Sequence, residues 1–276
     1  MNDNAKKLTI ALAGNPNSGK TTIFNLMTGM HQHIGNYPGV TVEKKEGICF
    51  HKGFELEIVD LPGTYSLTAY SEEEVVARNF IIEQKPDVVI NVIDASNLER
   101  NLYLTVQMME LNVPLVLAFN MSDIAMQKGL VFDIEKLSML LNVRIVQTIG
   151  NRSKGIEELL DAAIAAAQEP VKNLASLIKY GSEIEGEIDK LSQRFSELRE
   201  NRWLAIKLLE QDSDVIKHLR NEEIIIAAAE SIMRLKKIFG EEPEIIIADR
   251  RYGFISGACQ ETVKNTEQQA ETPASE

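Results

Sequence analysis

The sequence has little cysteine and few long apolar runs. Its only two thiols, Cys49 and Cys259, make no disulfide framework, which favours a reducing compartment. The longest apolar runs, such as residues 224–229, end well short of the roughly 18 residues that a membrane span needs. The polar start, residues 1–7, leads into too short an apolar stretch for an export signal. We therefore expect a soluble chain.

Positive charge is also scarce. The 276 residues include 29 Lys and Arg against 41 Asp and Glu, so the formal net charge is −12. Nucleic-acid affinity rests on Lys and Arg that displace counterions, so we expect no nucleic-acid partner. With 44% hydrophobic residues the composition is globular, and the length fits one large domain or two smaller ones.

Up to residue 168, short apolar runs alternate with segments of helical spacing. The expected strands are 8–13, 56–59, 88–93, 115–119 and 143–146, and the expected helices include 20–28, 72–84 and 98–111. Such alternation predicts an α/β fold with a doubly wound, mostly parallel sheet. Ser71 and Glu74 predict a capping box at the start of the second helix. Ligands of such sheets bind beyond the carboxyl ends of the strands.

After Pro170 the pattern changes. Proline disfavours helix in the residue before it, and the following stretch has apolar residues at three- and four-residue spacing with few turn residues. We therefore predict a domain at 1–168 and a small all-α domain at 171–260. Residues 261–276, which are rich in Glu, Gln and Thr, are expected to form a flexible tail.

A phosphate-binding loop follows the first expected strand and opens the first helix. Two glycines spaced by four residues, then Lys and Thr, let backbone N–H groups face an anion at a helix N-terminus. Lys20 reaches the terminal phosphates and Thr21 can ligate Mg²⁺. The predicted nucleotide contacts here are Gly14, Asn15, Pro16, Asn17, Ser18, Gly19, Lys20, Thr21 and Thr22.

Two further segments fit the γ-phosphate end of a nucleoside triphosphate. After the expected strand 56–59, Asp60 can hold Mg²⁺ through water and the Gly63 N–H can contact the γ-phosphate. In the turn-rich loop 35–43, the Thr41 hydroxyl is expected to complete the Mg²⁺ shell, and such loops become free on hydrolysis. The predicted contacts are Gly39, Val40, Thr41, Asp60, Leu61, Pro62 and Gly63.

The base is predicted to be guanine. The carboxylate of Asp123 can accept two hydrogen bonds from guanine N1–H and the 2-amino group, which adenine does not offer. The next loop can give the guanine oxygen a backbone N–H from Gly150, although glycine leaves this loop free and predicts fast nucleotide exchange. The predicted base contacts are Asn120, Met121, Asp123, Thr148, Ile149 and Gly150.

Together these motifs resemble a known family. The phosphate loop, the loop 35–43, the run 60–67 and the stretch 94–104 are similar to the cytoplasmic GTPase domain of ferrous iron transport protein B. In that family a helical domain that slows GDP release follows, and residues 251–255 are similar to the segment before its membrane region. The resemblance therefore covers nearly the whole chain, and implies a P-loop, Ras-like fold.

The resemblance also implies a place and partners. The chain is expected on the cytoplasmic side of a bacterial inner membrane, where GTP binding and hydrolysis regulate Fe²⁺ uptake. The implied partners are GTP, the membrane permease region of the same polypeptide and a small cytoplasmic iron-transport accessory protein.

The sequence departs from Ras-like enzymes at Thr64, which stands where a glutamine orients the attacking water. No arginine lies in the loop around Thr41 either, so slow intrinsic turnover is expected. Asn17 matches the asparagine that potassium-activated GTPases use as a K⁺ ligand, and we hypothesise K⁺-stimulated hydrolysis. The expected catalytic residues are Lys20, Thr41, Asn17 and Gly63, the metal ligands Thr21, Thr41, Asp60 and Asn17, and the cofactors GTP or GDP, Mg²⁺ and K⁺.

Two other functions stay open at this point. One is a soluble GTPase that acts in tRNA modification or ribosome assembly, against which the negative charge counts. The other is a nucleotide-dependent binding module with negligible hydrolysis. His31 and His33 could contact Fe²⁺, but two ligands make a weak site, and a solvated helix end is favoured.

Overall fold

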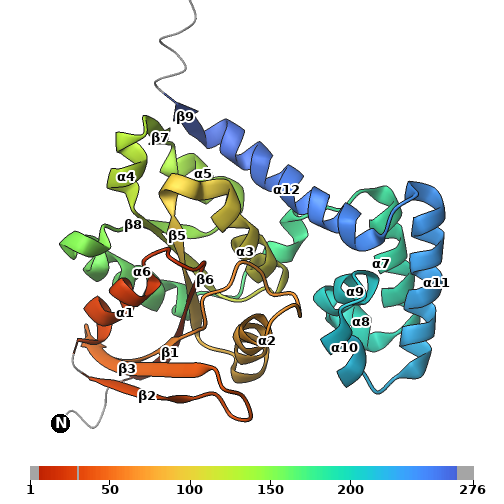
Figure 1. The fold of residues 1–276 in the computed structure, drawn as a ribbon, viewed down its shortest axis with the longest axis horizontal. Helices are drawn as coiled ribbons and strands as arrows, with labels where there is room; N and C mark the ends of the chain where they lie inside the picture. Colours follow the sequence, from red (N-terminus) through yellow and green to blue (C-terminus); the bar gives the residue numbers. More distant parts are fainter. Residues whose placement is uncertain (1–5, 30, 266–276) are drawn as a thin grey trace, which may run out of the picture.

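A central seven-stranded sheet organises the first part of the chain in the computed structural model, which describes residues 6–29 and 31–265 (Figure 1). The strand order is β2-β3-β4-β1-β5-β6-β8. Strands β4, β1, β5, β6 and β8 are parallel, and β2 and β3 extend the sheet in antiparallel fashion. The strands are β1 (Lys6–Gly14), β2 (Gln32–Asn36), β3 (Glu43–His51), β4 (Phe54–Asp60), β5 (Val88–Asp94), β6 (Leu115–Asn120) and β8 (Arg144–Gln147).

Helices cover both faces of this sheet, as the apolar strands require. On one face, β1 and β5 share a buried apolar cluster with α1 and α6. On the other face, a second buried apolar cluster continues into the helices of the second part of the chain. The doubly wound parallel sheet is confirmed. The helices of this part are α1 (Lys20–Thr28), α2 (Glu72–Asn79), η1 (Phe80–Gln84), η2 (Ala95–Asn97), α3 (Leu98–Glu110), α4 (Ser122–Gln127), α5 (Ile134–Leu141), η3 (Gly150–Arg152) and α6 (Ile156–Gln168).

The helix predicted over 72–84 is confirmed, as the α-helix α2 to Asn79 and the π-helix η1 from Phe80 to Gln84. Two other local expectations need correction. His33 lies in the exposed edge strand β2, and not at a helix end, because residues 32–36 pair with β3. The capping box is half formed: Ser71 Oγ accepts the Glu74 N–H at 3.2 Å, but the Glu74 carboxylate bonds Ser66 and the Tyr70 N–H instead.

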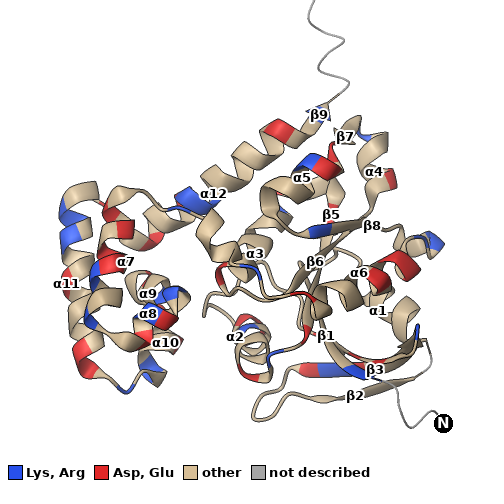
Figure 2. Ribbon diagram, turned by 180° about the vertical axis from the view of Figure 1, so that it is seen from behind, with Lys and Arg blue, Asp and Glu red and all other residues tan. Residues whose placement is uncertain are grey.

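The second part is helical and lies beside the sheet domain, with α12 crossing between the two (Figure 1). Lys and Arg alternate with Asp and Glu over its helices (Figure 2). None of the helices in the described ranges is long and apolar enough to cross a bilayer. The elements are η4 (Leu174–Leu177), α7 (Ser182–Arg194), α8 (Ser196–Glu200), α9 (Arg202–Leu209), α10 (Ser213–His218), α11 (Glu222–Phe239) and α12 (Pro243–Thr262).

The end of α12 returns to the first part of the chain. It packs along α3 and α5, and the following strand β9 (Val263–Asn265) pairs antiparallel with β7 (Leu130–Phe132). Residues 261–265 therefore belong to α12 and β9 and not to a tail, because their backbone is bonded to the first domain. The rest of the predicted tail, 266–276, lies outside the described residues.

Candidate nucleotide site

The predicted contacts gather where the parallel strands end. Gly14, Asp60 and Asn120 are the last residues of β1, β4 and β6, and the strand register brings these ends to one edge of the sheet. Parallel strands point their carboxyl ends the same way, so a ligand site at this edge follows from the topology.

The phosphate loop depends on close backbone approaches at two glycines. A Cβ on Gly14 would lie 2.6 Å from the Val92 carbonyl oxygen. Gly19 has φ +88°, and a Cβ there would lie 2.2 Å from Asn120 Nδ2. Both positions therefore exclude a side chain.

Two buried polar atoms in this loop lack a hydrogen-bond partner among the described residues. They are Asn15 Oδ1 and Ser18 Oγ, and both side chains are almost completely buried. Buried polar atoms are rarely left unpaired, so they fit a site that a polar ligand completes. The Asn15 Nδ2 donates to the Arg100 carbonyl at 3.4 Å and ties the loop to α3.

Lys20 and Asp60 face each other across the site. The Lys20 ammonium contacts the Asp60 carboxylate, and both side chains are buried. Burial raises the pKa of the Asp60 carboxyl, and Lys20 and Lys45 partly offset this effect. The two groups that were predicted to serve phosphate and Mg²⁺ are therefore adjacent, with an ion pair between them.

The loops expected near the γ-phosphate differ in how firmly they are held. Thr41 and Gly63 are exposed, as is Thr21 at the start of α1. Tyr37 anchors the Thr41 loop: its ring is buried, its N–H donates to the Val42 carbonyl at 2.9 Å, and its hydroxyl lies 3.4 Å from the Asp60 carbonyl.

The Thr64 side chain is bonded within its own loop and does not point to a nucleotide as a water-orienting side chain would. Its hydroxyl donates to the Ser66 carbonyl at 2.6 Å, and its N–H donates to the Gly14 carbonyl at 3.2 Å. Thr64 is buried. Its hydroxyl proton is therefore used within the loop that follows Gly63.

Asn120 joins the phosphate loop to the base loop. Its Nδ2 donates to the Ser18 carbonyl at 2.9 Å, and its Oδ1 accepts the Gly150 N–H at 3.0 Å. The Gly150 N–H is thus bonded to Asn120, which corrects the expectation that it is available to guanine. Ile149 also exchanges two backbone bonds with Lys154, so the loop is tied at several points. The predicted fast exchange stays a prediction.

The remaining candidate residues lie at exposed or half-buried positions. Asn17 is exposed in a left-handed backbone conformation, φ +66°, at the mouth of the loop. Asp123 is half-buried in the first turn of α4, two residues after Met121. His31 and His33 are exposed, and within the described residues no three His, Cys, Asp or Glu side chains group as a metal site.

Sequence reasoning missed the buried charges between the two parts of the chain. Arg78 and Arg251 are both almost completely buried and paired with carboxylates. Arg251 lies within α12 and Arg78 within α2. No local pattern marks either arginine as buried, because its partners are far away in the sequence.

The fold and this site define a P-loop GTPase-type domain followed by a helical domain. The chain belongs to the family of ferrous iron transport protein B, which matches residues 8–163, and the FeoB cytosolic helical domain matches residues 180–264. This agrees with the resemblance carried by the motifs.

Relatives and solved structures agree over most of the chain. A Porphyromonas gingivalis Fe(2+) transport protein A/FeoB fusion protein is 41% identical over 98% of this chain, and the Salmonella typhimurium Fe(2+) transporter FeoB is 41% identical over 95%. The chain spans about a third of each relative, 34%.

Two solved cytosolic structures have the same architecture. A GDP-bound variant of the S. thermophilus NFeoB has a TM-score of 0.85 at 39% identity, covering 93% of this chain and 100% of that one. The apo cytosolic domain of T. maritima FeoB has a TM-score of 0.80 at 32% identity, covering 94% and 100%.

Proposed function

We propose that this chain binds GTP and GDP and hydrolyses GTP. The adjacency of Lys20, Asp60 and the phosphate loop supports this proposal most strongly, because it brings a buried ammonium and a buried carboxylate together at the edge where the parallel strands end. The GDP-bound S. thermophilus structure supports the choice of guanine. Asp123 is the residue that would read the base.

Two cations complete the proposed site. Thr21, Thr41 and Asp60 supply oxygen ligands of the kind that Mg²⁺ prefers, directly or through water. Asn17, which is exposed and has a left-handed backbone conformation, supplies an amide oxygen for K⁺. When bound, these ions neutralise charge on the phosphates, and Lys20 adds a fixed positive charge from the protein.

We propose that GTP hydrolysis is slow without K⁺. Thr64 uses its hydroxyl proton within its own loop, so no side chain at that place orients a water. Positive charge then has to come from Lys20 and from the metal ions, with Gly63 and Thr41 closing on the γ-phosphate.

In the full-length protein, we propose, nucleotide state regulates Fe²⁺ uptake. The support is the naming of relatives as Fe(2+) transporters and their threefold greater length, which leaves room for a permease region. The fusion of Fe(2+) transport protein A to one relative supports a small accessory protein as a partner. The alternative of a tRNA or ribosome GTPase finds no support in these relatives.

Calorimetry and single-turnover kinetics test the proposal. We expect GTP and GDP to bind in the presence of Mg²⁺ and ATP to bind at least about 100-fold more weakly, because adenine leaves the Asp123 carboxylate unpaired. With protein in excess over GTP, we expect GDP and phosphate to form. Equal affinity for ATP would contradict the guanine assignment, and no GDP after hours in any monovalent salt would favour a non-hydrolysing binding module.

A further inference from the structure

Arg100 of α3 contacts two parts of the nucleotide site through two different groups. Its backbone carbonyl accepts a hydrogen bond from Asn15 Nδ2 of the phosphate loop at 3.4 Å. Its guanidinium Cζ lies 4.1 Å from the centre of the Tyr65 ring, in the loop after Gly63. The stretch 94–104, for which no nucleotide contact is predicted, therefore meets the run 60–67 at this pair.

The start of α3 holds the backbone of Arg100 in place. Asn101 Oδ1 accepts the Asp94 N–H at 3.1 Å, and Asn101 Nδ2 donates to the Asn97 carbonyl at 2.9 Å. Asn101 is buried, whereas Arg100 is exposed. The Arg100 side chain therefore extends from an anchored backbone to the surface, where it contacts Tyr65.

The contact between Arg100 and Tyr65 is a cation–π stack. Within residues 6–29 and 31–265, the Arg100 guanidinium has no carboxylate partner that would compete for it. A planar guanidinium is attracted to an aromatic face and lies flat on it better than an ammonium does. The Tyr65 residue is 41% exposed, so this contact is made at the surface. The stack thus ties Tyr65 to α3.

The loop just before Tyr65 lies against the phosphate loop. The Thr64 N–H donates to the Gly14 carbonyl at 3.2 Å. Gly63 is close as well, because a Cβ on it would lie 3.5 Å from Pro16 Cα. Gly63, whose N–H is expected to contact the γ-phosphate, is only two residues from the stacked ring.

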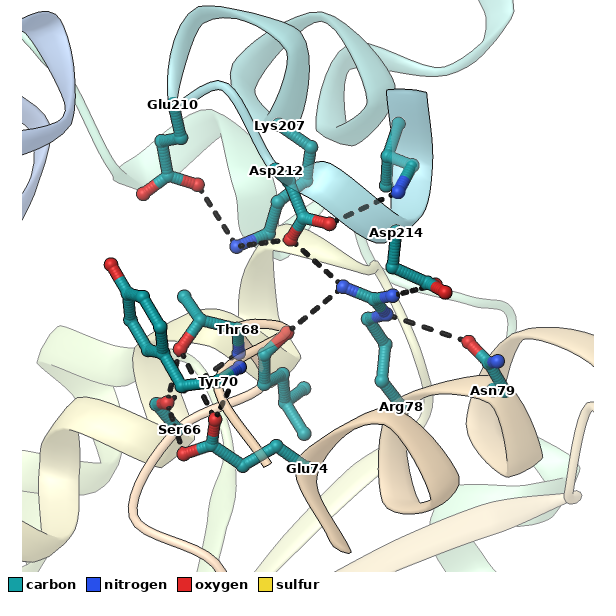
Figure 3. Close-up of polar contacts among 12 residues, drawn as sticks. Ser66, Thr68, Tyr70, Glu74, Arg78, Asn79, Lys207, Glu210, Asp212 and Asp214 are labelled. Carbon is teal, nitrogen blue, oxygen red and sulfur yellow. Dashed lines mark hydrogen bonds and ion pairs between the residues drawn. The ribbon is translucent and has the colours of Figure 1, made fainter. Parts of the chain in front are cut away.

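The loop just after Tyr65 is also bonded. The Ser66 carbonyl accepts the Thr64 hydroxyl at 2.6 Å, and Ser66 Oγ donates to Glu74 Oε1 at 2.7 Å (Figure 3). Because the backbone is held on both sides of Tyr65, the place of the Tyr65 ring and the place of Gly63 depend on each other.

We propose that Arg100 is a positioning residue for GTP hydrolysis, which acts through its stack on Tyr65. The stack limits the positions open to the loop after Gly63, so that the Gly63 N–H spends more time at the γ-phosphate. Without the stack the loop samples more positions, and the fraction of bound GTP that meets Gly63 falls. This role rests on the proposed GTP hydrolysis.

The wild-type protein is tested first. Single-turnover kinetics in Mg²⁺ and KCl, with protein in excess, gives the rate constant for bound GTP, and calorimetry gives the affinity for GDP. Absence of GDP formation would overturn the proposed hydrolysis together with the role of Arg100. If the wild type hydrolyses GTP, the variants decide about Arg100 alone.

Two substitutions remove the stack from its two sides. Arg100→Gln removes the cation, and Tyr65→Leu removes the ring. We expect each to lower the single-turnover rate by about two- to five-fold, the contribution of an exposed cation–π contact. The affinity for GDP should not change, because GDP has no γ-phosphate for Gly63 to contact. The double variant is expected to be no slower than the single ones, since both remove the same contact.

Two further variants serve as controls. Tyr65→Phe keeps the ring and should keep the wild-type rate. Arg194→Gln removes another exposed arginine over an aromatic ring, since Arg194 Cζ lies 5.0 Å from the centre of the Phe195 ring, but this stack lies in the helical domain. It should also keep the wild-type rate.

Four results would overturn the positioning role. One is a wild-type rate in Arg100→Gln or in Tyr65→Leu, and another is a double variant in which the two effects simply add. A third is a loss of GDP affinity and melting temperature in step with the rate, as a merely structural contact would give. The fourth is an equal loss of rate in Arg194→Gln.

Discussion

The Lys20 ammonium is bound to the Asp60 carboxylate, one at the start of α1 and the other at the end of β4. In the proposed complex Lys20 bonds the phosphates and Asp60 bonds the Mg²⁺ shell, so nucleotide and metal must separate the pair. We expect Lys20→Ala to lower GTP affinity by about 10- to 100-fold, the loss of one or two charge-assisted hydrogen bonds. Asp60→Asn should weaken the dependence of GTP affinity on Mg²⁺, because one of the three proposed oxygen ligands loses its charge.

Isothermal titration with and without Mg²⁺ checks both changes. Lys52→Ala is the control, because Lys52 is an exposed lysine whose carboxylate partner, Asp161, is also at the surface. A Lys20→Ala protein that binds GTP as the wild type does would contradict the assignment of this lysine to the phosphates.

Gly19→Ala is expected to abolish nucleotide binding. Its Cβ would lie 2.2 Å from Asn120 Nδ2, in a backbone conformation that L side chains rarely adopt. The bond from Asn120 to the Ser18 carbonyl would then be lost, and with it the link between phosphate loop and base loop. Gly186→Ala is the control: a Cβ there meets open space in the middle of α7, so it should raise stability by about 1 kcal/mol. Thermal melts and titration of GDP separate the two effects.

Asp123→Asn is expected to exchange the preferred base. An asparagine amide cannot accept both guanine N–H groups, but its NH₂ can donate to the 2-carbonyl of xanthine. GTP affinity should fall by about 100-fold or more and xanthosine triphosphate should become the better ligand. Asp161→Asn removes a surface carboxylate of the same type and should change neither affinity. Competition between the two triphosphates measures the exchange, and an unchanged preference for GTP would place base recognition elsewhere.

Glu187 predicts a specific loss of stability in acid. Burial would raise the pKa of this carboxyl, but hydrogen bonds from Arg234, Lys190 and Ser231 lower it to about 2 from 4.5. A carboxyl with a depressed pKa stabilises the folded state above the unfolded pKa, and this stability is lost as pH falls from about 4.5 to about 2.

In Arg234→Gln, the free energy of unfolding should fall less between about pH 4.5 and about pH 2. The difference from the wild type should be only about 1 kcal/mol, since Arg234 is half exposed and solvent screens the pair. Urea unfolding at several pH values gives the profile. Lys237→Gln removes a positive charge from the exposed side of the same helix and should leave the profile parallel to that of the wild type. A parallel profile for Arg234→Gln as well would show that Arg234 does not hold the Glu187 pKa down.

The sequence predicted those parts of the fold and site that depend on local patterns. The strand runs, α1 and the nucleotide motifs could be found because periodicity and loop chemistry act over a few residues. The edge strand β2 could not, since residues 32–36 are exposed throughout and only their pairing with β3 makes them a strand. The same holds for β9 and for the end of α12, whose partners lie more than 100 residues earlier.

The site shows the same limit. The identity of the nucleotide contacts came from short motifs, but the use of the Gly150 N–H by Asn120 depends on two loops meeting in space. Glu74 bonds Ser66 and the Tyr70 N–H for a similar reason, although its spacing from Ser71 predicted a capping box. Arg78 and Arg251 are the extreme case, because burial of a charge is decided by carboxylates that only the tertiary fold supplies.

Potassium is expected to accelerate GTP hydrolysis through Asn17. The Asn17 side chain is exposed at the mouth of the phosphate loop, and a bound K⁺ would place positive charge between the phosphates, where this chain offers no arginine in the loop around Thr41. We expect turnover in KCl to exceed that in NaCl by about 10-fold or more, the scale of one well-placed electrostatic contact in a transition state. Asn17→Ala should remove the difference while GDP affinity in NaCl stays as it was. Asn25→Ala, an exposed asparagine further along α1, is the control and should keep the K⁺ effect. Equal rates in both salts would leave Lys20 and Mg²⁺ as the proposed sources of positive charge, and a K⁺ effect that survives Asn17→Ala would overturn the assignment of Asn17 as the K⁺ ligand.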